Sequence, residues 1–155
     1  MGKSITNDTK IIGVVARADP MKGYPNLFLA TRHLLQYRKD FVVMCVIKGS
    51  QSEKSYLLQK CKMTGVADHF IFLDPTDKLE FFYPQLDLLA LTSSFGEGLP
   101  NVLIEAMACG TKCVATDVGD VNKIIFDETA IVAPDNPVKL AYAMNIHLDK
   151  PLGKS

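Results

Sequence analysis

Two glutamates, Glu97 and Glu105, stand at a spacing that suits the binding of a polar ligand. Seven residues separate them, with Glu97 in a Gly-rich turn and Glu105 inside a short apolar segment of helical pattern. Pro100 suits the first helical position and Gly110 suits a left-handed residue at the helix end. The first turn of such a helix offers free N–H groups, which lie between the two carboxylates. The pattern therefore predicts a site for an anionic, hydroxyl-rich ligand such as a sugar nucleotide.

Two cations, Arg17 and Lys22, follow the first apolar run of the chain. Arg17 can bind phosphate oxygens through two hydrogen bonds, and Lys22 can act as a point charge. One loop can bring both onto a single pyrophosphate, although taken alone two solvated charges beside a turn are the commoner arrangement. The sequence lacks both Gly-x-x-x-x-Gly-Lys-Ser/Thr and Gly-x-Gly-x-x-Gly. Their absence argues against a P-loop nucleotidase and a standard dinucleotide dehydrogenase.

Short apolar runs alternate with segments of helical periodicity along the chain. The predicted strands are residues 11–16, 41–47, 70–73, 86–91, 113–116 and 130–133. The predicted helices are residues 26–37, 51–63, 78–83, 100–108, 121–125 and 138–148. Several runs are rich in Val, Ile and Leu without alternation, which is typical of strands covered on both faces. We expect an α/β fold: a doubly wound, Rossmann-like parallel sheet of about six strands with helices on both faces.

Ligands of doubly wound sheets bind beyond the carboxyl ends of the strands. The segments to inspect are therefore residues 17–23, 48–50, 74–77, 92–101 and 117–120. Domain organisation is simple: residues 1–10 form a polar lead, 11–149 the ligand-binding domain and 150–155 a tail after the last helix. We expect a chain cut from a larger protein.

The composition excludes several classes of protein. The 155 residues suit one domain, and 48% apolar with 22% charged residues is typical of a globular protein. Seventeen basic and seventeen acidic residues cancel, so broad electrostatic capture of nucleic acid is disfavoured. No apolar run approaches the ~18 residues of a transmembrane helix.

Cysteines and histidines give no sign of a metal site. We expect the cysteines to be reduced, small apolar side chains in a reducing compartment, most simply the cytoplasm. They are Cys45, Cys61, Cys109 and Cys113. The histidines have no ligand spacing and are expected on helix surfaces or in loops: His33, His69 and His147. The chain also contains no Asp-x-Asp.

Residues 93–110 read Ser-Ser-Phe-Gly-Glu-Gly-Leu-Pro-Asn-Val-Leu-Ile-Glu-Ala-Met-Ala-Cys-Gly. This Glu-x7-Glu pattern resembles the donor-binding signature of retaining glycosyltransferases of family 4, which have the GT-B architecture. Residues 12–17 with Lys22-Gly23, residues 86–94, and residues 114–119 with Ile124-Ile125 resemble further elements of that family. Together these segments cover roughly residues 11–145.

The resemblance implies one half of a GT-B enzyme, the C-terminal, donor-binding domain. The full enzyme would be a hexosyltransferase that moves a sugar from a UDP-, GDP- or ADP-sugar to an acceptor sugar, lipid or other hydroxyl compound. The acceptor would bind to a missing N-terminal domain, so the isolated chain would transfer little or no sugar. Peripheral membrane contact of the full enzyme is compatible with this assignment, and no cofactor or metal is expected.

The resemblance also implies roles for individual residues. Glu105 would accept hydrogen bonds from the ribose hydroxyls, and Glu97 from hydroxyls of the donor sugar. Arg17 and Lys22 would neutralise the diphosphate as it leaves. Backbone groups would contact the sugar and diphosphate around Gly98, Leu99, Pro100 and Asn101. The base is expected to contact, largely through backbone groups, the loop after the third strand around Leu73, Asp74 and Pro75.

Two positions depart from the family pattern, since Lys112 stands where proline is frequent and Asp120 where a second glycine is common. Lys112 is expected at a strand edge, and Asp120 is expected to affect the floor of the donor site. Paired carboxylates also occur in glycoside hydrolases, but the cationic loop favours a phosphorylated ligand. A non-catalytic nucleotide-binding or regulatory module, or another GT-B enzyme such as a phosphorylase or a sugar-nucleotide epimerase, remains an alternative.

Overall fold

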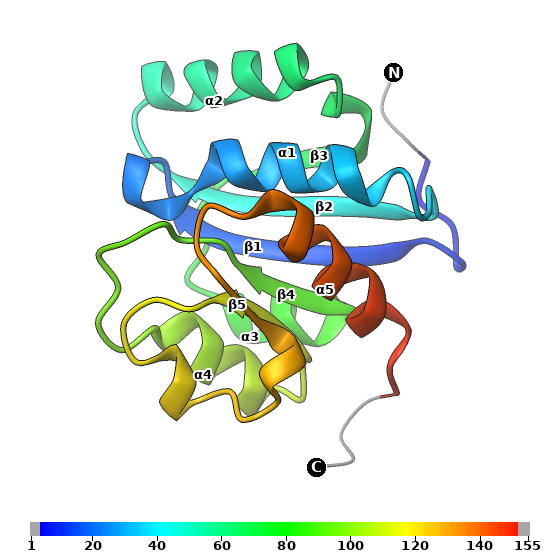
Figure 1. Ribbon diagram of the computed structural model, residues 1–155. Helices are drawn as coiled ribbons and strands as arrows, with labels where there is room; N and C mark the ends of the chain where they lie inside the picture. Colours follow the sequence, from blue (N-terminus) through cyan, green and yellow to red (C-terminus); the bar gives the residue numbers. More distant parts are fainter. Residues whose placement is uncertain (1–3, 152–155) are drawn as a thin grey trace.

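A computed structural model describes residues 4–151 of the chain and shows one six-stranded parallel sheet (Figure 1). The strand order is β3-β2-β1-β4-β5-β6, with every adjacent pair parallel. The strands are β1 (Lys10–Arg17), β2 (Phe41–Lys48), β3 (Phe70–Leu73), β4 (Leu88–Leu91), β5 (Cys113–Thr116) and β6 (Ile131–Val132). The order reverses between β1 and β4, so the predicted doubly wound sheet is confirmed.

Helices cover both faces of this sheet, as predicted. They are α1 (Tyr24–Leu34), α2 (Gln51–Thr64), α3 (Leu79–Phe82), α4 (Asn101–Ala108) and α5 (Pro137–Asp149). Figure 1 shows α1 and α5 packed side by side on one face and α3 and α4 on the other. Strand β2 is buried along nearly its whole length, since helices on both faces exclude water from an apolar strand.

The helices that begin at the carboxyl edge of the sheet differ in how their N-termini are capped. Helix α2 begins with a capping box, in which Ser50 and Glu53 bind each other's backbone N–H groups. Helix α5 is capped by the side chain of Asn136. Helices α1 and α4 have no side-chain cap, but α1 begins with the buried Tyr24 and with Pro25, so the N–H groups that a ligand could bind are those of the first turn of α4.

Several predicted boundaries are wrong in detail. Residues 121–125 form only a single 3-10 turn, Val121–Lys123, because Asp127 already begins the next turn and leaves too few residues for a helix. Pro100 precedes α4 in an extended conformation instead of occupying its first position. Gly110 does adopt the predicted left-handed conformation, with φ of 80°.

Lys112 does more than occupy a strand edge. Its Nζ donates to the carbonyl oxygen of His147 at 2.6 Å and also to that of Lys150, so its charge lies at the C-terminus of α5. His147 is buried rather than on a helix surface, and its Nε2 lies 3.1 Å from the hydroxyl of Thr129. Burial is the main cause that lowers the pKa of His147 below its ordinary value near 6.5.

The four cysteines are free, as expected of reduced thiols. Burial raises the pKa of Cys61 and of Cys113 to about 12, so both stay neutral thiols at physiological pH. Within residues 4–151, no helix combines the length and apolar character needed to cross a membrane. The ends of the predicted polar lead and tail, residues 1–3 and 152–155, lie outside the described residues.

Candidate functional site

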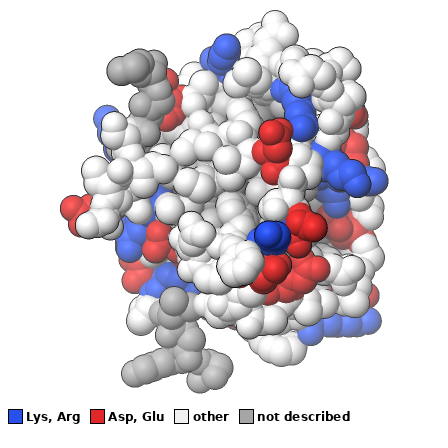
Figure 2. Space-filling model, turned by 180° about the vertical axis from the view of Figure 1, so that it is seen from behind, with Lys and Arg blue, Asp and Glu red and all other residues white. Residues whose placement is uncertain are grey.

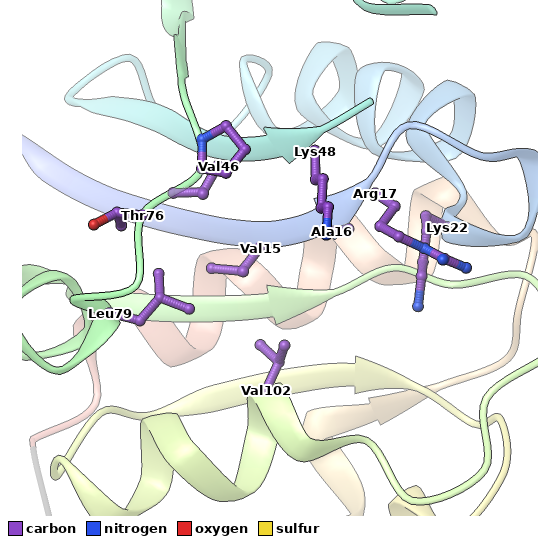
Figure 3. Close-up of a pocket in the computed structure, with 10 residues that line it drawn as sticks. Val15, Ala16, Arg17, Lys22, Val46, Lys48, Thr76, Leu79 and Val102 are labelled. Carbon is purple, nitrogen blue, oxygen red and sulfur yellow. The ribbon is translucent and has the colours of Figure 1, made fainter. Parts of the chain in front are cut away.

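A cavity of about 360 Å³ opens at the carboxyl edge of the sheet (Figure 3). It is lined by the ends of β1 and β2, the β1–α1 loop, the segment after β3 and the first turn of α4. The lining residues are Val15, Ala16, Arg17, Lys22, Val46, Lys48, Pro75, Thr76, Leu79 and Val102. The cavity therefore lies at the predicted place, beside the point where the strand order reverses.

The two ends of the cavity differ in chemistry. Figure 3 shows Arg17 and Lys22 together at one end, with Thr76 and Leu79 at the other. Val102 points from α4 toward the middle of the cavity. A ligand that suits this arrangement has an anionic part at the cationic end and a less polar part at the other.

Arg17 and Lys22 thus line one cavity, as their spacing suggested. Each also has a carboxylate partner that the sequence did not reveal. The Arg17 guanidinium lies 3.1 Å from Asp19 and is largely exposed. Such an exposed ion pair contributes little stability, so Arg17 can turn to a ligand at small cost.

Lys22 is held more firmly, by the first signature glutamate. Its Nζ donates to Glu97 Oε2 at 2.8 Å, and the two side chains are only 16% and 10% exposed. The buried Ser93 donates its hydroxyl to the same carboxylate oxygen. Residues 75 positions apart in the chain therefore form one polar cluster beside the cavity.

Close backbone packing holds the β1–α1 loop against the segment before Glu97. Gly23 has φ of 70°, and a Cβ there would collide with the carbonyl oxygen of Thr92. The Thr92 hydroxyl donates to the carbonyl oxygen of Lys22 at 3.1 Å. The N–H of Ser94 donates to the carbonyl oxygen of Met21 at 2.8 Å. Lys22 and Glu97 meet because their two loops are joined in this way.

The loop after β5 packs against the backbone of the Gly-rich turn and supports it. Gly119 has φ of 50°, and a Cβ there would collide with the carbonyl oxygens of Glu97 and Gly98. The N–H of Asp120 donates to the Gly98 carbonyl oxygen at 2.9 Å. The Asp120 carboxylate instead pairs with Lys123 at 3.4 Å, so the backbone of Asp120 supports the turn and its charge points elsewhere.

Glu105 lies one turn inside α4, as predicted, but outside the lining of the cavity. Its carboxylate is exposed and accepts a hydrogen bond of 3.0 Å from the hydroxyl of Tyr83. Burial, followed by this hydrogen bond, raises the pKa of Tyr83. The neutral phenol therefore donates to Glu105 and orients it next to Val102, which does line the cavity.

Leu73 and Asp74 do not line the cavity. Asp74 points to solvent and lies 3.6 Å from Lys54, while Pro75 of the same predicted loop lines the cavity together with Thr76. Lys48 also lines the cavity. The sequence marked it only as part of segment 48–50, at the carboxyl end of a strand, and gave it no role of its own.

The predicted backbone contacts of the Gly-rich turn differ in exposure: Gly98, Leu99 and Asn101 are exposed, whereas Pro100 is buried and its carbonyl oxygen accepts from Leu103. Helix α4 has no side-chain cap. Among the described residues, no group of three or more His, Cys, Asp or Glu side chains could hold a metal ion. In the view from behind, Figure 2 shows basic and acidic side chains side by side, without a broad area of one sign.

The fold and the cavity define a Rossmann-like domain with a ligand site at the carboxyl edge of its sheet. Over residues 2–154 the chain matches the family described as Glycosyl transferases group 1, and it belongs to that family. A D-inositol 3-phosphate glycosyltransferase 2 from Catenulispora acidiphila is 30% identical, over 93% of this chain and 36% of that protein.

Solved structures support the same fold. The C-terminal domain of the group 1 glycosyl transferase LpcC from Francisella tularensis superimposes with a TM-score of 0.78 and 23% identity, over 91% of this chain and 76% of that one. The Anabaena protein HepE, solved in complex with UDP and glucose, gives 0.79 and 23%, over 92% and 40% of the two chains. The fold is thus that of a GT-B C-terminal domain, and the chain spans about a third of the curated relatives.

Proposed function

We propose that this chain is the donor-binding domain of a retaining, metal-independent glycosyltransferase that uses a nucleotide diphosphate sugar. The polarised cavity carries the proposal, since its cationic end and its apolar end match the two halves of a nucleoside diphosphate. UDP and glucose in the structure of HepE, a protein of the same fold, support the choice of ligand class.

The diphosphate is assigned to the end formed by Arg17, Lys22 and Lys48. The uncapped N-terminus of α4 adds open N–H groups near Val102, and its dipole favours a negative charge. In the transfer reaction the glycosidic bond to the diphosphate breaks, and the leaving group gains negative charge. Cations at this point stabilise that charge in the transition state, which is the contribution expected from this half of the enzyme.

The nucleoside is assigned to the other end of the cavity. Val46 and Leu79 offer apolar surface to a base, with Pro75 and Thr76 at the rim. Glu105 is assigned to the ribose, since its carboxylate is exposed and already oriented by Tyr83. A carboxylate can accept hydrogen bonds from both ribose hydroxyls.

The donor sugar is assigned to Glu97 and to the open backbone of Gly98 and Leu99. In the structure the Lys22 ammonium donates a hydrogen bond to the Glu97 carboxylate. We infer that the donor replaces this contact: Lys22 turns to the diphosphate, and Glu97 accepts from sugar hydroxyls. Both charges then keep a polar partner, so the exchange avoids leaving either one buried and alone.

The acceptor is assigned to the part of the full protein that this chain does not span. Without it no acceptor is positioned and water is not excluded, so orientation and desolvation effects are lost. We expect this chain alone to bind nucleotide and to transfer little or no sugar. The four free cysteines fit a reducing compartment such as the cytoplasm.

Arg17→Ala tests the assignment of the diphosphate. The variant should weaken binding of a nucleoside diphosphate more than binding of the matching nucleoside, measured by calorimetry, because only the diphosphate reaches Arg17. Arg32→Ala, which removes the same charge from the exposed face at the end of α1, is the control. Equal losses for diphosphate and nucleoside would contradict the assignment.

A further inference from the structure

Asp135 is the residue outside the assigned site whose geometry asks for an explanation. It lies between β6 and α5 and has φ of 57°, the only positive φ of a residue other than glycine within residues 4–151. This left-handed conformation costs a side chain of L configuration energy, although Asp tolerates it better than most residues. Such strain persists only where surrounding contacts enforce it.

Two hydrogen bonds enforce it here. Asp135 Oδ1 accepts from the hydroxyl of Ser94 at 2.6 Å and from the side-chain amide of Asn26 at 2.5 Å. Ser94 belongs to the segment between β4 and α4, and Asn26 to the first turn of α1. One carboxylate therefore ties together loops that follow three different strands.

The hydrogen bonds of Asp135 are connected to Glu97 through the neighbouring residues Ser93 and Ser94. Ser93 donates its hydroxyl to Glu97, while its carbonyl oxygen accepts a hydrogen bond of 2.6 Å from Thr116. Ser94, the next residue, donates its N–H to Met21 and its hydroxyl to Asp135. The segment that presents Glu97 is thus fixed on three sides, and only the side toward α5 depends on a strained residue.

We propose that Asp135 is a positioning residue for Glu97, which acts through Ser94 and sets how well the site holds the sugar part of the donor. The effect of Asp135 on sugar binding rests on the proposed function. Its effect on the position of the loop does not. Asp135 lies apart from the cavity lining and needs no contact with the ligand. Its effect is to keep Ser93 and Glu97 where Glu97 can accept from sugar hydroxyls.

Two substitutions separate the hydrogen bonds from the backbone conformation. Asp135→Gly removes the acceptor and relieves the strain, so it should not lower the melting temperature by much. Asp135→Asn keeps an acceptor at Oδ1 and tolerates the left-handed conformation, so it serves as the matched control. Asn26→Ala removes only the bond to α1 and leaves the bond to Ser94 in place.

The first measurement needs no ligand. Hydrogen exchange of the Ser94 amide, which is bonded to Met21, reports whether the loop opens. Asp135→Gly and Ser94→Ala should each speed this exchange by about threefold to tenfold, the range expected for the loss of one hydrogen bond. Asp135→Asn and Asn26→Ala should leave it nearly unchanged. Unchanged exchange in Asp135→Gly overturns the proposal.

The second measurement uses calorimetry with UDP, GDP and ADP and with UDP-glucose, GDP-mannose and ADP-glucose. For the nucleotide that the wild type binds, Asp135→Gly should weaken the sugar-bearing form by about threefold to tenfold and spare the diphosphate. Equal affinity for the sugar-bearing form in wild type and variant overturns the proposal. If the wild type binds none of the six compounds, the proposed function fails, and the exchange of Ser94 still decides the role of Asp135.

Discussion

Lys22→Met tests the chemistry of the site most fully, because Lys22 is both a partner of Glu97 and part of the cavity wall. Methionine keeps much of the apolar stem and removes the charge. Among residues 4–151, the Glu97 carboxylate then keeps only the hydroxyl of Ser93 as a side-chain donor. Breaking a fully buried pair costs ~3–5 kcal/mol and an exposed pair ~0.2–1 kcal/mol. For side chains 16% and 10% exposed we expect a loss of about 1–3 kcal/mol in the free energy of unfolding.

The affinity for the nucleoside diphosphate should also fall in this variant, for a separate reason. A charged hydrogen bond to phosphate contributes ~1.5–3 kcal/mol, so the nucleoside diphosphate should bind about 10- to 150-fold more weakly. The matching nucleoside should bind as it does to the wild type, because it does not reach Lys22. Urea denaturation measures the first effect and calorimetric titration, under conditions where the variant is folded, measures the second.

Lys150→Met is the matched control for this experiment. Lys150 pairs with Asp127 at 3.4 Å and lies at the far end of α5, at the opposite edge of the sheet. The control has the same change in net charge and should leave the affinity for the diphosphate unaltered. Lys22 does not bind the diphosphate if Lys22→Met weakens binding of the nucleoside as much as binding of the diphosphate, or if Lys150→Met causes the same loss.

Three further predictions follow from the geometry. Glu105→Ala should weaken nucleotide binding by ~1–3 kcal/mol in calorimetry, since a charged hydrogen bond to ribose is lost; unchanged affinity removes Glu105 from the site. Lys112→Met should lower the free energy of unfolding by ~1–2 kcal/mol, measured in urea, because the C-terminus of α5 loses its cation, and should spare binding; weakened binding contradicts this role. Because burial lowers the pKa of His147, only the unfolded state gains its proton as pH falls from 7 through 6.5, so stability should decrease there. His147→Gln should flatten that slope in thermal unfolding at several pH values, and an unaltered slope excludes His147 as its source.

The sheet could be predicted because its strands are short apolar runs in the sequence. Strand β2, with seven consecutive apolar residues before Lys48, can be buried on both faces only inside a covered sheet. The type of the short helical segments was harder to predict. Val121 and Ile125 have helical spacing and are both buried, yet spacing alone does not distinguish one 3-10 turn from a helix. The burial of His147 could have been predicted, because His147 lies one turn after the buried Met144 and two turns after the buried Leu140.

The contacts within the site could not be read from the sequence. The bond between Lys22 and Glu97 depends on how two loops pack around Gly23 and Thr92, which no local pattern specifies. For the same reason the sequence marked the loop around Leu73, Asp74 and Pro75 for the base without showing that Pro75 lines the cavity and Asp74 points to solvent. The roles of these residues in binding stay predictions.

Titration of the wild-type chain with UDP, GDP and ADP shows whether the cavity binds a nucleoside diphosphate without a metal ion. Each titration is run in a calorimeter with magnesium and again with EDTA. We expect one of the three to bind, with the same affinity in both conditions, and to bind Lys22→Met about 10- to 150-fold more weakly. Binding that disappears in EDTA, or no binding of any diphosphate, would contradict this expectation.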